Sequence, residues 1–211
     1  DMPPALASKQ IDGYCVAEPF CAMGELKAKG QILRFNGDIW KGAPCCVVVM
    51  HEDDAMDPDR AAWAQGVHNA IVRAQLHLGE NRKEMAHMLS KNGKKYLPMP
   101  AKVVERAMLF YDPAYYNNPA AIQNLDWKQD RINFQAWPYP SATVRMIDEL
   151  KNTVVTGDAN FLNKITGDHV AKDLVQYDYI KKSLDKYPDW KNDASVPQSG
   201  NPFERTEVIK T

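Results

Sequence analysis

The chain has 211 residues, 45% of them hydrophobic, and its 26 basic and 27 acidic side chains leave a formal net charge of -1. This composition is typical of a soluble globular protein with room for one large core or two modest ones. A near-neutral balance without a basic cluster argues against nucleic acid as a partner. No apolar run approaches the roughly 20 residues that span a bilayer, so the sequence predicts no transmembrane helix.

The first fifty residues alternate predicted helices and strands. The opening DMPPALASKQIDG runs directly into helical sequence at residues 3–12, so we expect the chain to begin within a longer protein. A second helix is predicted over residues 20–29, ending at Gly30. Apolar or β-branched runs predict strands over residues 13–18, 31–35 and 45–51. This alternation predicts an α/β fold.

The rest of the chain is predicted to be mainly helical. Asp57 as N-cap and Pro58 at the first helical position open a long amphipathic helix that continues to Leu78. Residues 112–140, rich in aromatic residues, Asn and Pro, predict a long packed loop. Further amphipathic helices are predicted over residues 81–91, 100–111, 141–153 with Ser141 as cap, and 170–184.

Few residues indicate chemistry. The four cysteines form no CxxC and have no histidine at a zinc-finger spacing, and they leave the redox compartment undecided. HEDD at residues 51–54 could be a hard-metal site, but adjacent strand residues point to opposite faces, which favours a solvated strand end. GxSxG, P-loop and GxGxxG sequences are absent. The sequence therefore predicts no metal site and no cofactor.

Two short stretches are candidate ligand contacts. Glu18 ends the apolar run GYCVAEPF directly before Pro19, where it is either a site residue or an ordinary solvated strand end. In DIWKGAP, Trp40 and Lys41 stand beside a Gly and a Pro in a rigid loop. Lys41 could contact an anion as a point charge, or it could be an exposed loop lysine.

These same stretches resemble a known family. GYCVAEPF, a helix, DIWKGAP about two dozen residues later, a strand and a Pro-opened helix are similar to the C-terminal half of nitrate- and bicarbonate-binding proteins of ABC importers. That group includes sulfonate- and thiamine-precursor-binding proteins. Ala17 and Phe20 replace the Gly and Trp of the family's GYCVGEPW-like strand, and GAPC replaces the end of its second motif.

The resemblance implies part of a type II periplasmic-binding-protein clamshell, an α/β fold with a helix-rich C-terminal portion. Residues 1–20 would be a remnant of lobe two and the hinge, residues 21–185 the returning part of lobe one, and residues 186–211 an extended or flexible tail. The first half of the clamshell would then be missing. Exposed edges of an incomplete lobe favour a homodimer.

The resemblance also implies a function, that of a non-enzymatic solute-binding subunit of an ABC importer. It would bind a small anionic or polar solute between its lobes and deliver it to the membrane permease, either in the periplasm or anchored on the outer side of the membrane. Glu18 would line or brace this cleft. Lys41 matches an anion-contacting lysine of nitrate binders, where bicarbonate binders carry an acidic residue, so the lysine favours nitrate.

Two alternatives remain open. The first is a cytoplasmic nitrate or nitrite sensor with the same fold, which four reduced cysteines would suit. The second is an enzyme of the related thiamine-pyrimidine branch, in which histidine supplies the chemistry and iron assists. The five histidines form no recognisable cluster, which argues against the enzyme.

Overall fold

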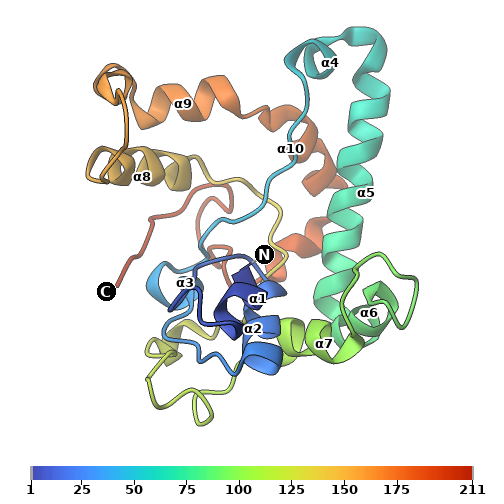
Figure 1. Cartoon of the computed structure of the whole chain (residues 1–211). Coiled ribbons are helices and arrows are strands. Elements are labelled where there is room, and N and C mark those ends of the chain that lie inside the picture. The colour runs from blue at the N-terminus through green and yellow to red at the C-terminus, as the bar shows by residue number, and fades with distance from the viewer. Residues whose placement is uncertain (1, 211) are drawn as a thin grey trace. The chain divides into compact units, whose positions relative to one another are not determined.

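The computed structural model describes residues 2–210, in which helices are joined by turns and extended segments (Figure 1). These residues divide into two compact units. Unit 1 contains the residues up to Cys45, then His77–Phe134, and the last residues from Ile209 on. Unit 2 contains Cys46–Leu76 and Gln135–Val208.

Unit 1 is built around a helical core. Its elements are α1 (Met2–Ala7), α2 (Phe20–Ala28), α3 (Asn36–Ile39), α6 (Arg82–Leu89), α7 (Ala101–Leu109) and the 3-10 helix η2 (Leu125–Trp127). Helix α7 packs against both α2 and α6. Their facing apolar side chains, together with Met99 just before α7, form one buried cluster: Ala22, Met85, Ala86, Met99, Val103, Val104, Ala107 and Met108. Burial of this cluster stabilises these short helices, because isolated helices of eight or nine residues are only marginally stable in water.

A second cluster in unit 1 ties the residues before α3 to the long loop. Phe35, Tyr116, Ala121 and Ile122 are all buried. The rings of Phe35 and Tyr116 meet edge to face, with centroids 5.1 Å apart. This cluster fixes the segment that leads into DIWKGAP.

Unit 2 is also helical. Its elements are α4 (Glu52–Met56), η1 (Pro58–Arg60), most of α5 (Ala61–Glu80), α8 (Pro140–Lys151), η3 (Asn160–Lys164), α9 (Gly167–Leu174), α10 (Tyr177–Lys186) and η4 (Pro188–Asn192). Helices α8 and α9 approach so closely that a Cβ on Gly167 would lie 2.4 Å from the Cα of Val144. Only glycine fits at this contact. No helix among residues 2–210 is long and apolar enough to cross a membrane.

The residues after α10 belong to unit 2 and contribute to its interior. Trp190 and Val196 are buried. The indole N–H of Trp137 donates to the Phe203 carbonyl at 2.9 Å, and the Tyr139 hydroxyl donates to the Pro202 carbonyl at 3.0 Å. Part of the segment predicted as an extended or flexible tail is therefore packed against the residues that lead into α8.

The predicted strands over residues 13–18, 31–35 and 45–51 are wrong for residues 2–210. The β-type pairing there consists of two isolated bridges, Trp40 with Ile209 and Asn117 with Ala120. β-Propensity makes a segment extended, but a strand is stable only when neighbours complete its hydrogen bonds. The helix-rich portion of the predicted fold is present, the strands of its α/β class do not form, and the clamshell remains a prediction.

Local capping accounts for three further corrections. The single helix predicted over residues 170–184 is two helices, because Thr166 caps α9 and Gln176 caps α10 through their side chains. Ser141 lies inside the first turn of α8 and does not cap it. HEDD forms no strand end: His51 caps α4, with its imidazole accepting from the Asp53 N–H at 3.3 Å.

Candidate functional site

Glu18 lies between an extended segment and α2, and both of its carboxylate oxygens are used. Oε2 accepts the Ala22 N–H at 3.0 Å, one of the amides that the first turn of a helix leaves unsatisfied. Oε1 accepts from Nε of Arg131 at 2.6 Å. Glu18 therefore braces the start of α2 through one oxygen and pairs with Arg131 through the other.

Arg131 is the centre of a buried ion-pair group, the Arg131 cluster, with Glu18, Glu25, Arg106 and Tyr116. Its side chain has no exposed surface. Nη2 lies 2.7 Å from Oε2 of Glu25, and Nη1 donates to the Tyr116 hydroxyl at 2.8 Å. Oε1 of Glu25 accepts from Nη2 of Arg106 and from the Tyr116 hydroxyl, both at 2.7 Å. All three guanidinium nitrogens of Arg131 are thus paired.

The charges of the Arg131 cluster compensate one another. Burial alone would raise the pKa of Glu25, but hydrogen bonds from Arg106 and Tyr116 and the charge of Arg131 outweigh it, so this pKa lies below its ordinary value. Close by, burial and the neighbouring Glu18 raise the pKa of the Cys21 thiol to about 11. Cys21 is accordingly a protonated thiol at neutral pH and a weak nucleophile.

Trp40 and Lys41 lie just after α3. Residues 36–43, which comprise α3 and the turn that follows it, are called the Lys41 turn here, and hydrogen bonds from buried or half-buried side chains hold them in place. Asp38 is fully buried and accepts the backbone N–H groups of Gln123 and Asn124, both at 2.8 Å. Nη1 of Arg34 approaches Asp38 at 3.0 Å. Gln129 accepts the Gly42 N–H at 2.8 Å and donates to the Gly37 carbonyl at 2.6 Å.

Lys41 itself is half-buried and has no ion-pair or hydrogen-bond partner among residues 2–210. Trp40 is also half-buried and pairs with Ile209 through an isolated bridge, next to a 2.8 Å bond from the Lys210 N–H to the Ile39 carbonyl. Trp40 thereby anchors the turn, whereas Lys41 carries a charge that residues 2–210 leave uncompensated.

Phe35 and Asn36, which are consecutive in the chain, connect the Arg131 cluster to the Lys41 turn. The guanidinium of Arg131 lies over the Phe35 ring, 5.2 Å from its centroid. The Asn36 amide donates to the Cys15 sulfur at 3.6 Å. The two predicted site regions thus share one scaffold in unit 1.

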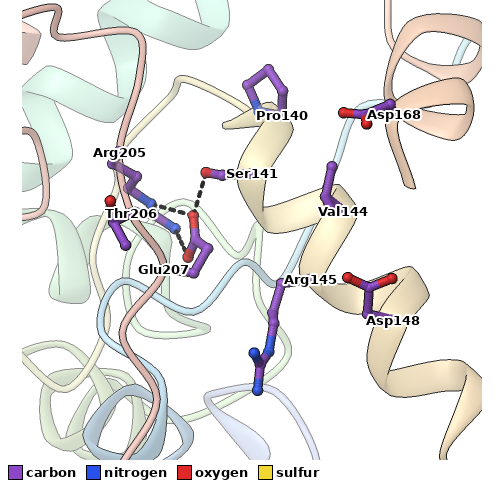
Figure 2. A pocket seen from close by; sticks show the side chains of 9 residues that line it. All are labelled: Pro140, Ser141, Val144, Arg145, Asp148, Asp168, Arg205, Thr206 and Glu207. Atoms are coloured by element: carbon purple, nitrogen blue, oxygen red, sulfur yellow. Dashed lines mark hydrogen bonds and ion pairs between the residues drawn. The ribbon is translucent and has the colours of Figure 1, made fainter. Parts of the chain in front are cut away.

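Unit 2 contains an open pocket of about 470 Å³ that none of the predicted site residues lines (Figure 2). Its wall includes the Glu207 cluster, made of Ser141, Arg205 and Glu207. The Ser141 hydroxyl donates to Oε1 of Glu207 at 2.7 Å, and Arg205 donates to both Glu207 oxygens at 2.8 and 3.0 Å. The guanidinium of Arg205 also stacks over Tyr139, 4.2 Å from the ring centroid.

Most of the side chains that line this pocket are polar or charged. Asp148 from α8 and Asp168 from α9 add exposed carboxylates to its wall (Figure 2). The Ser141 hydroxyl donates to the Glu207 carboxylate, and no histidine is among the residues that line the pocket. Within residues 2–210 no three His, Cys, Asp or Glu side chains gather as metal ligands.

Sequence reasoning missed the residues that organise both regions. Arg131 reaches Glu18 across 113 positions, and Gln129 reaches Gly42 across 87. No local pattern marks Arg131 or Gln129, because tertiary packing brings in the partners named above; Asp38 has one local partner, Arg34, and its other partners, Gln123 and Asn124, are distant in the sequence. Charge alone does not mark Arg131 either, because the same loop also contains Asp112, Asp126, Lys128 and Asp130.

Comparison with known proteins agrees with the resemblance described from the sequence. Residues 1–90 match the NMT1-like family, a nitrate/sulfonate/bicarbonate substrate-binding family. The chain is 25% identical over 173 residues to the bicarbonate transport ATP-binding protein CmpC of Synechococcus elongatus. The match covers 71% of this chain and 24% of that protein. The protein of the same name from Synechococcus sp. gives the same values.

The chain thus spans about a quarter of the length of these curated relatives. No solved structure matches it significantly. GYCVAEPF and DIWKGAP both lie within the residues that match the family. The resemblance of this chain to the nitrate- and bicarbonate-type substrate-binding proteins of ABC importers is therefore confirmed.

Proposed function

We propose that the chain is a solute-binding module of an ABC-type importer and that it binds a small anion without chemical turnover. The family match covers Glu18, Trp40 and Lys41. The observation that carries the anion proposal is Lys41, a half-buried cation without a partner among residues 2–210, on a turn held by Asp38 and Gln129.

The physical argument for an anion rests on charge and rigidity. A lysine ammonium offers three donors and no acceptor, and placing it partly out of water without a counter-charge costs free energy. A bound anion would supply that counter-charge. Because the turn is already fixed by hydrogen bonds, little ordering entropy would be lost on binding.

Among small anions we favour nitrate. The resemblance implies an anion-contacting lysine at this position in nitrate binders and an acidic residue in bicarbonate binders. CmpC is named as a bicarbonate transport protein, so bicarbonate is the competing ligand. Direct competition between the two anions decides between them.

The proposal extends to the assembly. By the family resemblance, residues 1–20 belong to the end of lobe two and the hinge, residues 21–185 to the return through lobe one, and residues 186–211 to a tail. The module would act outside the cytoplasmic membrane, close around its solute and dock on the permease.

One observation favours a second candidate. The relatives are named ATP-binding proteins, and this chain matches about a quarter of their length. A module of this kind could therefore sense the anion beside an ATP-binding subunit inside the cell. Co-purification with the permease supports the first candidate, and co-purification with the ATP-binding subunit supports the second.

Isothermal titration with nitrate, nitrite, bicarbonate and sulfate tests the shared anion-binding function. We expect Lys41→Ala to weaken nitrate binding at least about tenfold, equivalent to about 1.4 kcal/mol. Lys94→Ala is the matched control, because Lys94 is an exposed lysine in the same unit. The proposal is wrong if the folded wild-type protein binds none of these anions, or if both variants bind equally well.

A further inference from the structure

Ile209 and Lys210 belong to unit 1 and lie against the Lys41 turn. Ile209 forms an antiparallel bridge with Trp40, and the Lys210 N–H donates to the Ile39 carbonyl at 2.8 Å. Ile39, Trp40 and Lys41 belong to the same unit. The fold thereby brings a second lysine beside Lys41, although the two lysines are far apart in the sequence.

The geometry of the bridge places both lysines on one face. Trp40 is extended, with φ -122° and ψ 110°, and stands opposite Ile209. The residues that follow each of them, Lys41 and Lys210, are diagonal across the pair, with Cα atoms about 8 Å apart. Successive side chains of an extended chain point to opposite faces, so both lysines leave the pair on the face away from Trp40 and Ile209. Their flexible four-carbon stems allow both ammonium groups to reach one ion.

The ammonium group of Lys210 is held only loosely by its partners within the protein. Nζ lies 3.8 Å from Oδ2 of Asp126 and 5.2 Å from the centroid of the Trp127 ring. The side chains of Lys210 and Asp126 are 49% and 72% exposed, and an ion pair at that distance and exposure contributes little to stability. Lys210 can therefore turn from Asp126 to a bound anion with little loss of free energy.

The carboxylates near these lysines leave room for an anion. Asp38 is buried and paired with Arg34, and Asp130 pairs with Arg82 at 2.9 Å. Asp126 therefore supplies one negative charge against the two lysines. Like charges brought close together repel each other, and a bound anion would relieve that repulsion.

We propose that Lys210 is the second cation of the anion site and that a small oxyanion binds between the ammonium groups of Lys41 and Lys210. This rests on the proposed function, because it adds a residue to the site at which Lys41 is the first cation. Each ammonium group offers three donors, and an oxyanion such as nitrate has oxygens for both. Lys210 lies outside residues 1–90, so the family match does not predict this role.

Isothermal titration with nitrate, nitrite, bicarbonate and sulfate tests the role of Lys210. We expect Lys210→Ala to weaken binding about three- to fivefold, less than Lys41→Ala because Lys210 is the more exposed lysine. Lys210→Arg keeps the charge and should bind nearly as well as the wild type, and Lys94→Ala again serves as the control. If Lys41→Ala weakens binding and Lys210→Ala does not, the second cation is wrong and the proposed function stands. If the wild type binds none of these anions, both are wrong.

Asp126→Asn should change the affinity in the opposite direction. It removes the carboxylate that competes for Lys210, so anion binding should strengthen about two- to threefold. Asp12→Asn is the matched control, because Asp12 is an exposed aspartate in the same unit. In a Lys210→Ala background the gain from Asp126→Asn should largely disappear. A gain of equal size in that background would show that Asp126 acts through its charge alone and would contradict the role of Lys210.

Amine crosslinking tests the position of the two lysines without any anion. Disuccinimidyl tartrate, a short reagent that joins two amines, should link Lys41 to Lys210 in the folded protein at low concentration. Peptide mass spectrometry identifies the link, and saturating nitrate should reduce its yield. Modification of both lysines without a link between them would overturn the proposal, whatever the protein binds.

Discussion

The Arg131 cluster of unit 1 and the Glu207 cluster of unit 2 use the same chemistry, but the second as a whole borders an open pocket. Each pairs a guanidinium with carboxylate and hydroxyl oxygens. Arg131 has no exposed surface, and its three nitrogens contact Glu18, Glu25 and Tyr116. The Glu207 cluster instead forms the wall of an open pocket. Burial does not separate the two clusters, because the side chains of Arg205 and Glu207 are only 10% and 6% exposed; the difference is that the whole Glu207 cluster borders an open pocket.

The largest effect should come from Arg131→Met. This change leaves the carboxylates of Glu18 and Glu25 buried without their shared cation, and breaking such a buried pair typically costs about 3–5 kcal/mol. Urea unfolding followed by circular dichroism measures the loss, and hydrogen exchange by mass spectrometry locates it. We expect faster exchange in α2 and α7 of unit 1.

Arg145→Met is the matched control for Arg131→Met. Arg145 forms an exposed pair with Glu149 one helical turn away, with side chains 45% and 49% exposed. Exposed pairs of this kind contribute about 0.3–0.5 kcal/mol. If both changes had similar small effects, the Arg131 cluster would not be the brace that its geometry indicates.

Arg205→Met should have an intermediate effect. It removes one cation from Glu207, whose side chain is only 6% exposed but which keeps the hydrogen bond from Ser141. Loss of a hydrogen bond to a charged group costs about 1.5–3 kcal/mol. The same urea and exchange measurements apply, now with the change expected in α8. A loss larger than that of Arg131→Met would reverse the comparison between the two clusters.

The smallest effect concerns pH. The folded-state pKa of Glu25 lies below its ordinary value of 4.5, so its stabilising contribution is present above about pH 4.5 and is lost as the pH falls through the folded pKa. One such group changes the unfolding free energy by at most about 1.4 kcal/mol per pH unit. We expect Glu25→Gln to flatten the acid limb of stability below pH 4.5, and an unchanged slope would contradict this.

Local sequence signals predicted most of the helices. Gly30 ends α2 as expected, because Lys29 adopts a left-handed conformation and the Gly30 N–H closes on the Gly24 carbonyl at 3.1 Å. Asp57 and Pro58 open a helical segment as predicted, first as η1 and then as α5. The family resemblance likewise depended on short local motifs, and the comparisons confirm it.

The strands and the polar clusters were beyond local sequence information. The apolar run at residues 45–51 has high β-propensity, but a sheet also needs partner strands that residues 2–210 do not supply. Glu18 stood out as a charge before a proline, yet its bracing role depends on Arg131, 113 positions away. Neither partner could be identified from its neighbours in the chain.

By itself, the sequence determined where the helices lie, which motifs carry the family resemblance, and that Lys41 presents a cation beside Trp40. These features depend on contacts between residues close together in the chain, whose propensities and caps act locally. The tertiary structure alone decided that Glu18 braces α2 through Arg131, that Asp38 and Gln129 hold the Lys41 turn, and that the predicted strand over residues 45–51 finds no partner strand among residues 2–210. Those outcomes depend on which distant groups packing brings within hydrogen-bonding distance.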